Sequence, residues 1–92
     1  MTIKANDILA EVTKASDRRA AIHDHFRQLP AEFWNENTSY CYQLRLDETA
    51  QALATYIRKL PEAVRNKQSK AVAKATAYVK LLREEALVVS KH

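Results

Sequence analysis

Two segments of this chain share one pattern: FRQLPAEF (residues 26–33) and IRKLPEAV (residues 57–64). Each reads apolar, Arg, polar, Leu, Pro, two mixed residues and apolar, and together they hold both prolines of a chain that has no glycine. Proline fixes φ near the helical value, lacks an N–H, and disfavours helix in the residue before it. The repeat therefore predicts that one helix ends and another begins at each segment. Pro30 would open a short turn, and Pro61 the last helix.

The rest of the chain predicts helices between these turns. Glycine, on which tight hairpins depend, is absent, and alanine is abundant. Apolar residues recur in steps of three and four, which places them on one helical face in each of three segments. The expected faces are Ile8, Val12, Ala15, Arg19, Ile22, Phe26 and Leu29; Leu46, Ala50, Leu53, Ile57 and Leu60; and Val72, Ala75, Val79, Leu82 and Ala86. We expect one all-α domain over residues 1–92, a compact bundle of three to four helices.

Two parts of this bundle have alternative interpretations. The first helix is expected over about 6–28, but Arg19 interrupts its apolar face and Ser16-Asp17 would suit an N-cap, so a break near residue 16 is left open. The segment TSYCYQLRL, residues 38–46, alternates apolar and polar side chains like a strand. A single strand needs a partner, and no second alternating run is present. The segment is therefore either helical or irregular, with Asp47 capping the next helix, or one short strand.

The composition of the chain indicates its cellular location. One cysteine among 92 residues rules out an internal disulfide, and small secreted domains usually carry several. No apolar run is long enough to span a bilayer, and the N-terminus has no signal-peptide core. We therefore expect a bacterial cytoplasmic location and no membrane contact.

The last helix should run from Pro61 to about residue 87.

No residue pattern indicates catalysis or metal binding. His23 and His25 are two apart, so on a helix they point in different directions, and they are interpreted as solvated positions. Cys41 is interpreted as a buried or half-buried thiol without a chemical role. The chain has no phosphate-binding glycine loop and no nucleophile motif, and a helical chain of this size has little room for a pocket. We expect no enzyme activity, no cofactor, no metal and no small-molecule substrate.

The positive charge is concentrated in the last third of the sequence. The net charge is +4, and residues 61–92 hold seven basic and three acidic residues. In a continuous last helix Lys67, Lys70 and Lys74 would form a ridge facing solvent, with Arg65 elsewhere on the helix and Arg58 and Lys59 just before the turn. Such a ridge suits phosphate backbones. The alternative is an ordinary solvated helix face.

The aromatic segment is the second candidate surface. FWNENTSYCY, residues 33–42, contains Phe33, Trp34, Tyr40 and Tyr42. Tryptophan and tyrosine are favoured as anchors of protein interfaces, so Phe33, Trp34 and Tyr40 are candidates for partner binding. The alternative is that these aromatic residues close one end of the bundle.

In size and character the whole chain resembles the small anti-CRISPR proteins that phages and mobile elements use against multisubunit type I surveillance complexes. It shares with them a single domain of about ninety residues, a compact helical pattern, and no catalytic motif or signal peptide. No motif is shared, so no functional residue is carried over. Many such inhibitors are acidic and imitate DNA, whereas this chain is basic. The resemblance implies an inhibitor that would contact guide-RNA phosphates through Lys67, Lys70 and Lys74 and block access of the target strand.

Two functions are therefore expected. The first is a non-enzymatic inhibitor, from a phage or mobile element, that binds a host protein–nucleic acid complex with RNA or DNA phosphate contacts. The alternative is a small, sequence-tolerant nucleic-acid-binding protein or regulator. A structural subunit of a helical assembly is a third interpretation, in which the charge has no role.

Overall fold

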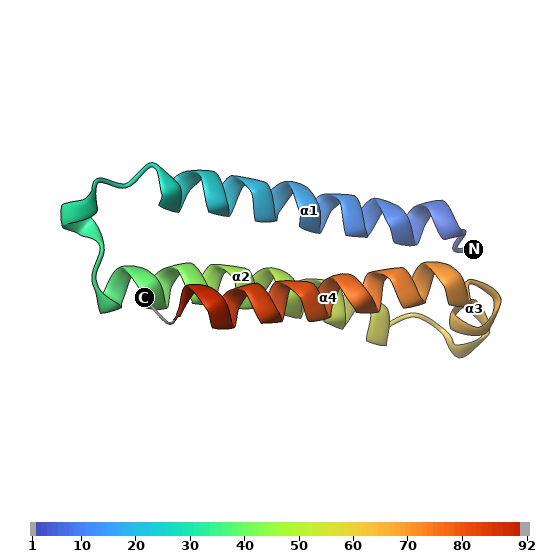
Figure 1. Ribbon diagram of the computed structural model, residues 1–92. Helices are drawn as coiled ribbons and strands as arrows, with labels where there is room; N and C mark the ends of the chain where they lie inside the picture. Colours follow the sequence, from blue (N-terminus) through green and yellow to red (C-terminus); the bar gives the residue numbers. More distant parts are fainter. Residues whose placement is uncertain (1, 91–92) are drawn as a thin grey trace.

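The computed structural model describes residues 2–90, which form a bundle of three long helices and two short helical segments (Figure 1). Its elements are α1 (Ala5–Arg27), the 3-10 helix η1 (Ala31–Phe33), α2 (Glu36–Arg58), α3 (Glu62–Lys67) and α4 (Ser69–Val89). The long helices run up, down and up along a rod of 50 × 18 × 17 Å. The expected all-α bundle of three to four helices is confirmed.

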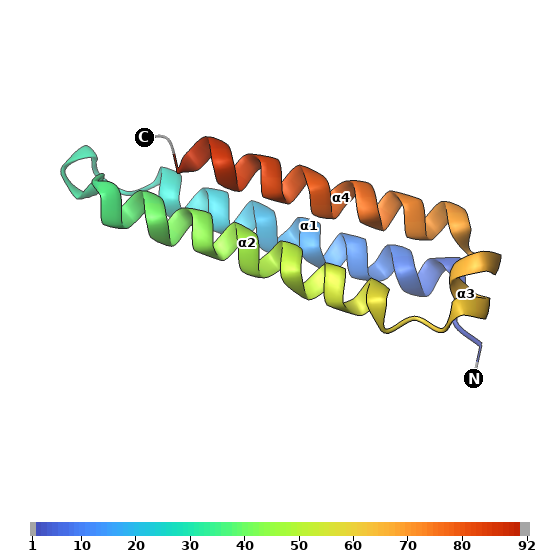
Figure 2. The ribbon, with the colours of Figure 1, turned by 90° about the horizontal axis from the view of Figure 1, so that it is seen from below.

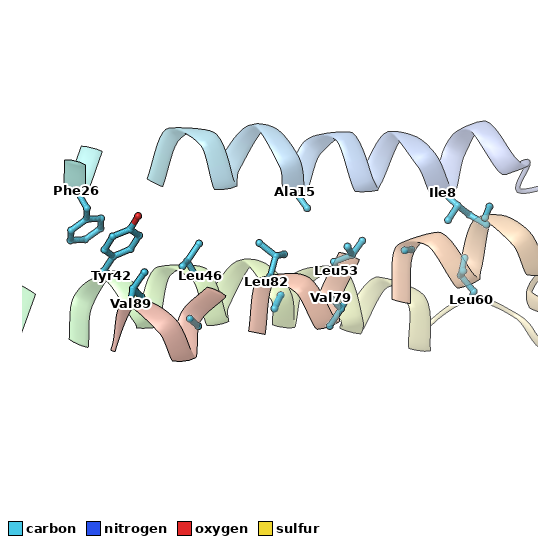
Figure 3. Packing of buried hydrophobic residues seen from close by; sticks show 14 residues of the cluster. Ile8, Ala15, Phe26, Tyr42, Leu46, Leu53, Leu60, Val79, Leu82 and Val89 are labelled. Carbon is cyan, nitrogen blue, oxygen red and sulfur yellow. The ribbon is translucent and has the colours of Figure 1, made fainter. Parts of the chain in front are cut away.

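The core runs along the whole length of the rod. Ile8 and Ala15 of α1 point toward α2 and α4 (Figure 3), and both residues are buried. Ile8, Leu46 and Leu82 are completely buried. The three faces predicted from spacing supply most of this core, because each long helix must bury one stripe against two neighbours. In Figure 2 all three long helices lie side by side, and α4 packs most extensively against α2.

Both proline segments form the predicted turns. Pro30 precedes η1, and its carbonyl accepts a hydrogen bond from the Phe33 N–H at 2.9 Å. Pro61 precedes α3, and its carbonyl accepts from the Arg65 N–H at 3.0 Å. The long helices before them end at Arg27 and Arg58, and the C-cap residues Gln28 and Lys59 keep right-handed conformations with φ values of −83° and −80°. No residue in 2–90 has a positive φ, which is how a chain without glycine makes these connections.

The strand interpretation of residues 38–46 is wrong, since these residues are the first half of α2. Asn35 caps this helix, with its side chain accepting from the Thr38 N–H at 3.0 Å, so Asp47 lies inside the helix and caps nothing. The apparent alternation arises because two pairs of apolar residues overlap in the sequence, and the two residues of each pair are four positions apart. Tyr42 and Leu46 are buried, whereas Tyr40 and Leu44 are exposed on another side.

The first helix agrees with its expected range of about 6–28, whereas the last helix differs from expectation. The first helix is continuous through residue 16, so the break left open there is absent. The last helix is interrupted at Gln68 (φ −105°, ψ 39°), which separates α3 from α4. Asn66 and Ser69 on either side have low helix propensity. The prediction of one helix from Pro61 to about residue 87 is therefore wrong.

Candidate functional site

A charged pair joins α1 to α4 inside the bundle. The Arg19 Nε donates hydrogen bonds to Glu85 Oε1 at 2.9 Å and Oε2 at 2.7 Å, and Arg19 Nη2 also pairs with Oε1. Both side chains are partly buried. Arg19 thus interrupts the apolar face of α1 because Glu85 of α4 meets it there.

His23 and Tyr42 extend this pair into a network over three helices. His23 lies one turn after Arg19, and its Nε2 is 3.0 Å from Glu85 Oε2. Its Nδ1 is hydrogen bonded to the Tyr42 hydroxyl of α2. Since a carboxylate only accepts, the Nε2–H of His23 donates to Glu85, and in the tautomer that carries this hydrogen Nδ1 accepts from the Tyr42 O–H. Within residues 2–90 no buried side-chain nitrogen or oxygen lacks a hydrogen-bond partner.

The pKa values of Glu85 and Tyr42 are shifted in opposite directions. Hydrogen bonding from Arg19, with help from His23, lowers the pKa of Glu85 although burial opposes this. Burial is the main reason that the pKa of Tyr42 is raised, while nearby Arg27 acts in the other direction. Glu85 is thus held as a carboxylate and Tyr42 as a neutral phenol at neutral pH.

The hydroxyl, imidazole and carboxylate of this network follow the order found in nucleophilic triads. A raised phenol pKa reduces the fraction of the reactive phenolate. By their contacts, the three groups form a hydrogen-bond network that joins the three long helices.

A cavity of about 520 Å³ adjoins this network at the end of the rod opposite α3. Its lining comprises the four network residues together with Arg27, Trp34, Val88 and Val89. The expectation that the chain has little room for a pocket is therefore wrong, because the sequence could not show how the helix ends meet.

The histidine and cysteine interpretations also need correction. His23 is 8% exposed rather than solvated, because spacing by four places it beside Arg19 on the buried side of α1. His25 is exposed, as expected, and its ring meets Phe26 edge-on at 5.0 Å between centroids. Cys41 is exposed rather than buried, since its neighbour Tyr42 takes the core position of this helical turn.

The predicted basic residues gather at the α3 end of the molecule but form no single ridge. Lys70 and Lys74 are one turn apart on α4, whereas Lys67 belongs to α3 beyond the interruption at Gln68. All three are exposed. Arg65 lies in α3, and Arg58 and Lys59 end α2 at the same end of the rod (Figure 1). Within residues 2–90, none of these six cations is in an ion pair.

The charge distribution follows the long axis. When the long helices are divided near their midpoints, the half containing α3 comprises residues 2–16 and 48–78, with eight basic and four acidic residues. The other described half, residues 17–47 and 79–90, has six basic and seven acidic residues. The excess positive charge of the described chain therefore lies at one end.

The aromatic segment divides between surface and core. Phe33 and Tyr40 are 56% and 61% exposed, whereas Tyr42 is 4% exposed and stacks on Phe26 with 4.5 Å between ring centroids. Trp34 is half-buried against the core, and its indole N–H donates to the Leu29 carbonyl at 3.3 Å. Phe33 and Tyr40 are thus surface residues, and Trp34 borders the cavity.

Comparisons with known protein families, curated protein sequences and solved structures found no match to this chain. In the part of the chain from residue 2 to residue 90, no helix has the length and apolar character to cross a membrane. The same residues contain no cluster of three or more His, Cys, Asp or Glu side chains that could hold a metal ion.

Proposed function

We propose that this chain is a non-enzymatic interaction protein that binds a host protein–nucleic acid complex in the bacterial cytoplasm. In this proposal it acts as a phage or mobile-element inhibitor of a CRISPR surveillance complex and blocks access of nucleic acid. The supporting observation is the concentration of exposed, unpaired cations at the α3 end.

Cations without internal partners suit a polyanionic ligand. Lys70 and Lys74 are one turn apart on α4, and Arg65 and Lys67 lie in the short α3 at the same end. A phosphate backbone presents closely spaced negative charges, and contacts with it release counterions. Seven of the eleven acidic residues lie in the other half of the rod, so the half with α3 keeps an excess of four positive charges.

The other end supports the protein part of the proposed interface. Phe33 and Tyr40 expose large aromatic surfaces near the start of α2, and such residues are frequent anchors in protein interfaces. The rod is 50 Å long, so its two ends reach different components of one large complex. In this arrangement the basic end contacts guide RNA, and Phe33 and Tyr40 contact a protein subunit.

A purified type I surveillance complex loaded with guide RNA tests the proposal. The wild-type chain should bind the complex and reduce its binding of target DNA in a gel-shift assay. Lys70→Glu with Lys74→Glu should weaken this inhibition by at least about tenfold. Lys80→Glu with Arg83→Glu is the matched control, because it makes the same charge change at exposed positions of the same helix. Equal inhibition by both double variants would refute the role of the basic end.

Direct nucleic-acid binding is the second candidate, because the basic end is exposed without any partner protein. A labelled single-stranded RNA or duplex DNA should then bind at about 50 mM salt, with an affinity that falls steeply as salt rises. Absence of oligonucleotide binding under these conditions would eliminate this candidate and leave the complex as the ligand.

A further inference from the structure

We propose that the cavity beside Arg19, His23 and Tyr42 is a binding site for a small organic anion with a planar apolar body, such as an aromatic carboxylate. The cavity lies away from the basic residues of the α3 end, so this inference and the proposed phosphate contacts can fail separately.

The size of the cavity fits a small ligand. Its volume of about 520 Å³ falls within the range of ~300–1,000 Å³ typical of ligand pockets. Three helices and the turn after α1 supply its walls, so the site exists only when the bundle is assembled. The network of Arg19, His23, Tyr42 and Glu85 holds four of its side chains in fixed positions.

The charges that line the cavity favour an anion. The guanidinium of Arg19 is neutralised by Glu85, and both nitrogens of His23 are already hydrogen bonded. Arg27 adds a second guanidinium, and among residues 2–90 no carboxylate pairs with it. A guanidinium binds a carboxylate through two parallel hydrogen bonds. The cavity therefore presents one uncompensated cation to a ligand.

The remaining walls favour a flat apolar group. Trp34 and Tyr42 contribute aromatic rings with 6.2 Å between their centroids, and Val88 and Val89 contribute aliphatic side chains. An aromatic ring would pack among these groups while its carboxylate reaches Arg27 at the exposed edge. Arg27 also lies in the last turn of α1, where a cation stabilises the helix end, so the test requires a readout other than stability.

Trp34 supplies that readout because it is the only tryptophan of the chain. In a two-dimensional NMR spectrum of the ¹⁵N-labelled full chain, its indole N–H gives one cross-peak from the cavity wall. Benzoate should shift this peak in a saturable manner within about 10 mM, as expected for so small a ligand. Benzamide keeps the ring without the charge, acetate and inorganic phosphate keep the charge without the ring, and all three should bind at least about tenfold more weakly.

Two matched variants complete the test. Arg27→Gln should weaken benzoate binding by about tenfold, the value of one charge-assisted hydrogen bond. Arg83→Gln removes an exposed arginine outside the cavity and should leave binding unchanged. The proposal is overturned if benzoate gives no saturable shift, if benzamide, acetate or phosphate binds as tightly as benzoate, or if both variants bind equally.

Discussion

At the scale of single residues, the buried network is the most distinctive feature of the molecule. The Tyr42 O–H donates a hydrogen bond to the Nδ1 of the Nε2–H tautomer of His23 across the α1–α2 contact, where both residues are nearly inaccessible to water. A buried acceptor that loses its donor carries a desolvation cost.

Tyr42→Phe should therefore lower the free energy of unfolding by about 1–3 kcal/mol, because His23 Nδ1 is left without a partner. Tyr40→Phe is the matched control, since its side chain is exposed, and should change stability by less than about 0.5 kcal/mol. Urea unfolding followed by circular dichroism measures both values. Equal stability of the two variants would contradict the network.

The lowered pKa of Glu85 predicts how the free energy of unfolding depends on pH. Its pKa is lowered in the folded chain, so its stabilisation is present above the unfolded pKa near 4.5 and is lost as the pH falls through the lower folded value. The free energy of unfolding should thus decline below about pH 5. In Glu85→Gln this decline should be shallower, and stability at pH 7 lower by about 1–3 kcal/mol.

The neighbouring Glu84 is exposed and provides the control for that series. Glu84→Gln should follow the wild-type pH profile of unfolding. A profile for Glu85→Gln that coincides with it from pH 3 to 7 would show that Arg19 and His23 do not depend on this carboxylate.

At the scale of elements, the start of α2 is determined by Asn35. Its side chain satisfies the Thr38 N–H, one of the donors that a helix leaves unpaired at its first turn. Asn35→Ala should lower the free energy of unfolding by about 1 kcal/mol. Asn37→Ala, two residues into the same exposed turn, should cost far less, and thermal unfolding distinguishes them. Equal losses would contradict the cap.

Sequence spacing was sufficient for the three buried faces and for both proline turns, because these depend on local chemistry. It was insufficient for the start of α2, where two i,i+4 pairs imitate strand alternation in Tyr40, Tyr42, Leu44 and Leu46. It also could not locate the interruption at Gln68, where the sequence has neither proline nor glycine.

Most of the candidate site could not be predicted from the sequence. Arg19 on an apolar face was the one visible signal, yet any of eleven acidic residues could have been its partner. Glu85 lies 66 positions away, and only the packing of α4 against α1 selects it. The exposure of Lys67, Lys70 and Lys74 was predicted correctly. The single helix predicted to hold all three is wrong, because Lys67 lies in α3 and the other two lie in α4.

At the scale of the whole molecule, α2 contacts both other long helices, so a defect at its centre should affect the entire bundle. Leu46 is completely buried, and Leu46→Ala should lower the free energy of unfolding by about 2–5 kcal/mol. Leu44→Ala, at a position 41% exposed on the same helix, should cost less than half as much. Urea unfolding measures both, and similar losses would contradict the packing described.

The excess positive charge of the described chain lies at the α3 end of the rod. The central claim is that the lysine amines at this end contact phosphate groups. Acetylation of lysines by an amine-reactive ester, read by mass spectrometry with and without saturating guide-RNA complex, tests this most directly. Lys67, Lys70 and Lys74 should become protected in the complex, whereas the exposed Lys80, in the other half of the rod, should stay reactive. Bound protein in which Lys67, Lys70 and Lys74 react as fast as in the free chain would contradict the claim.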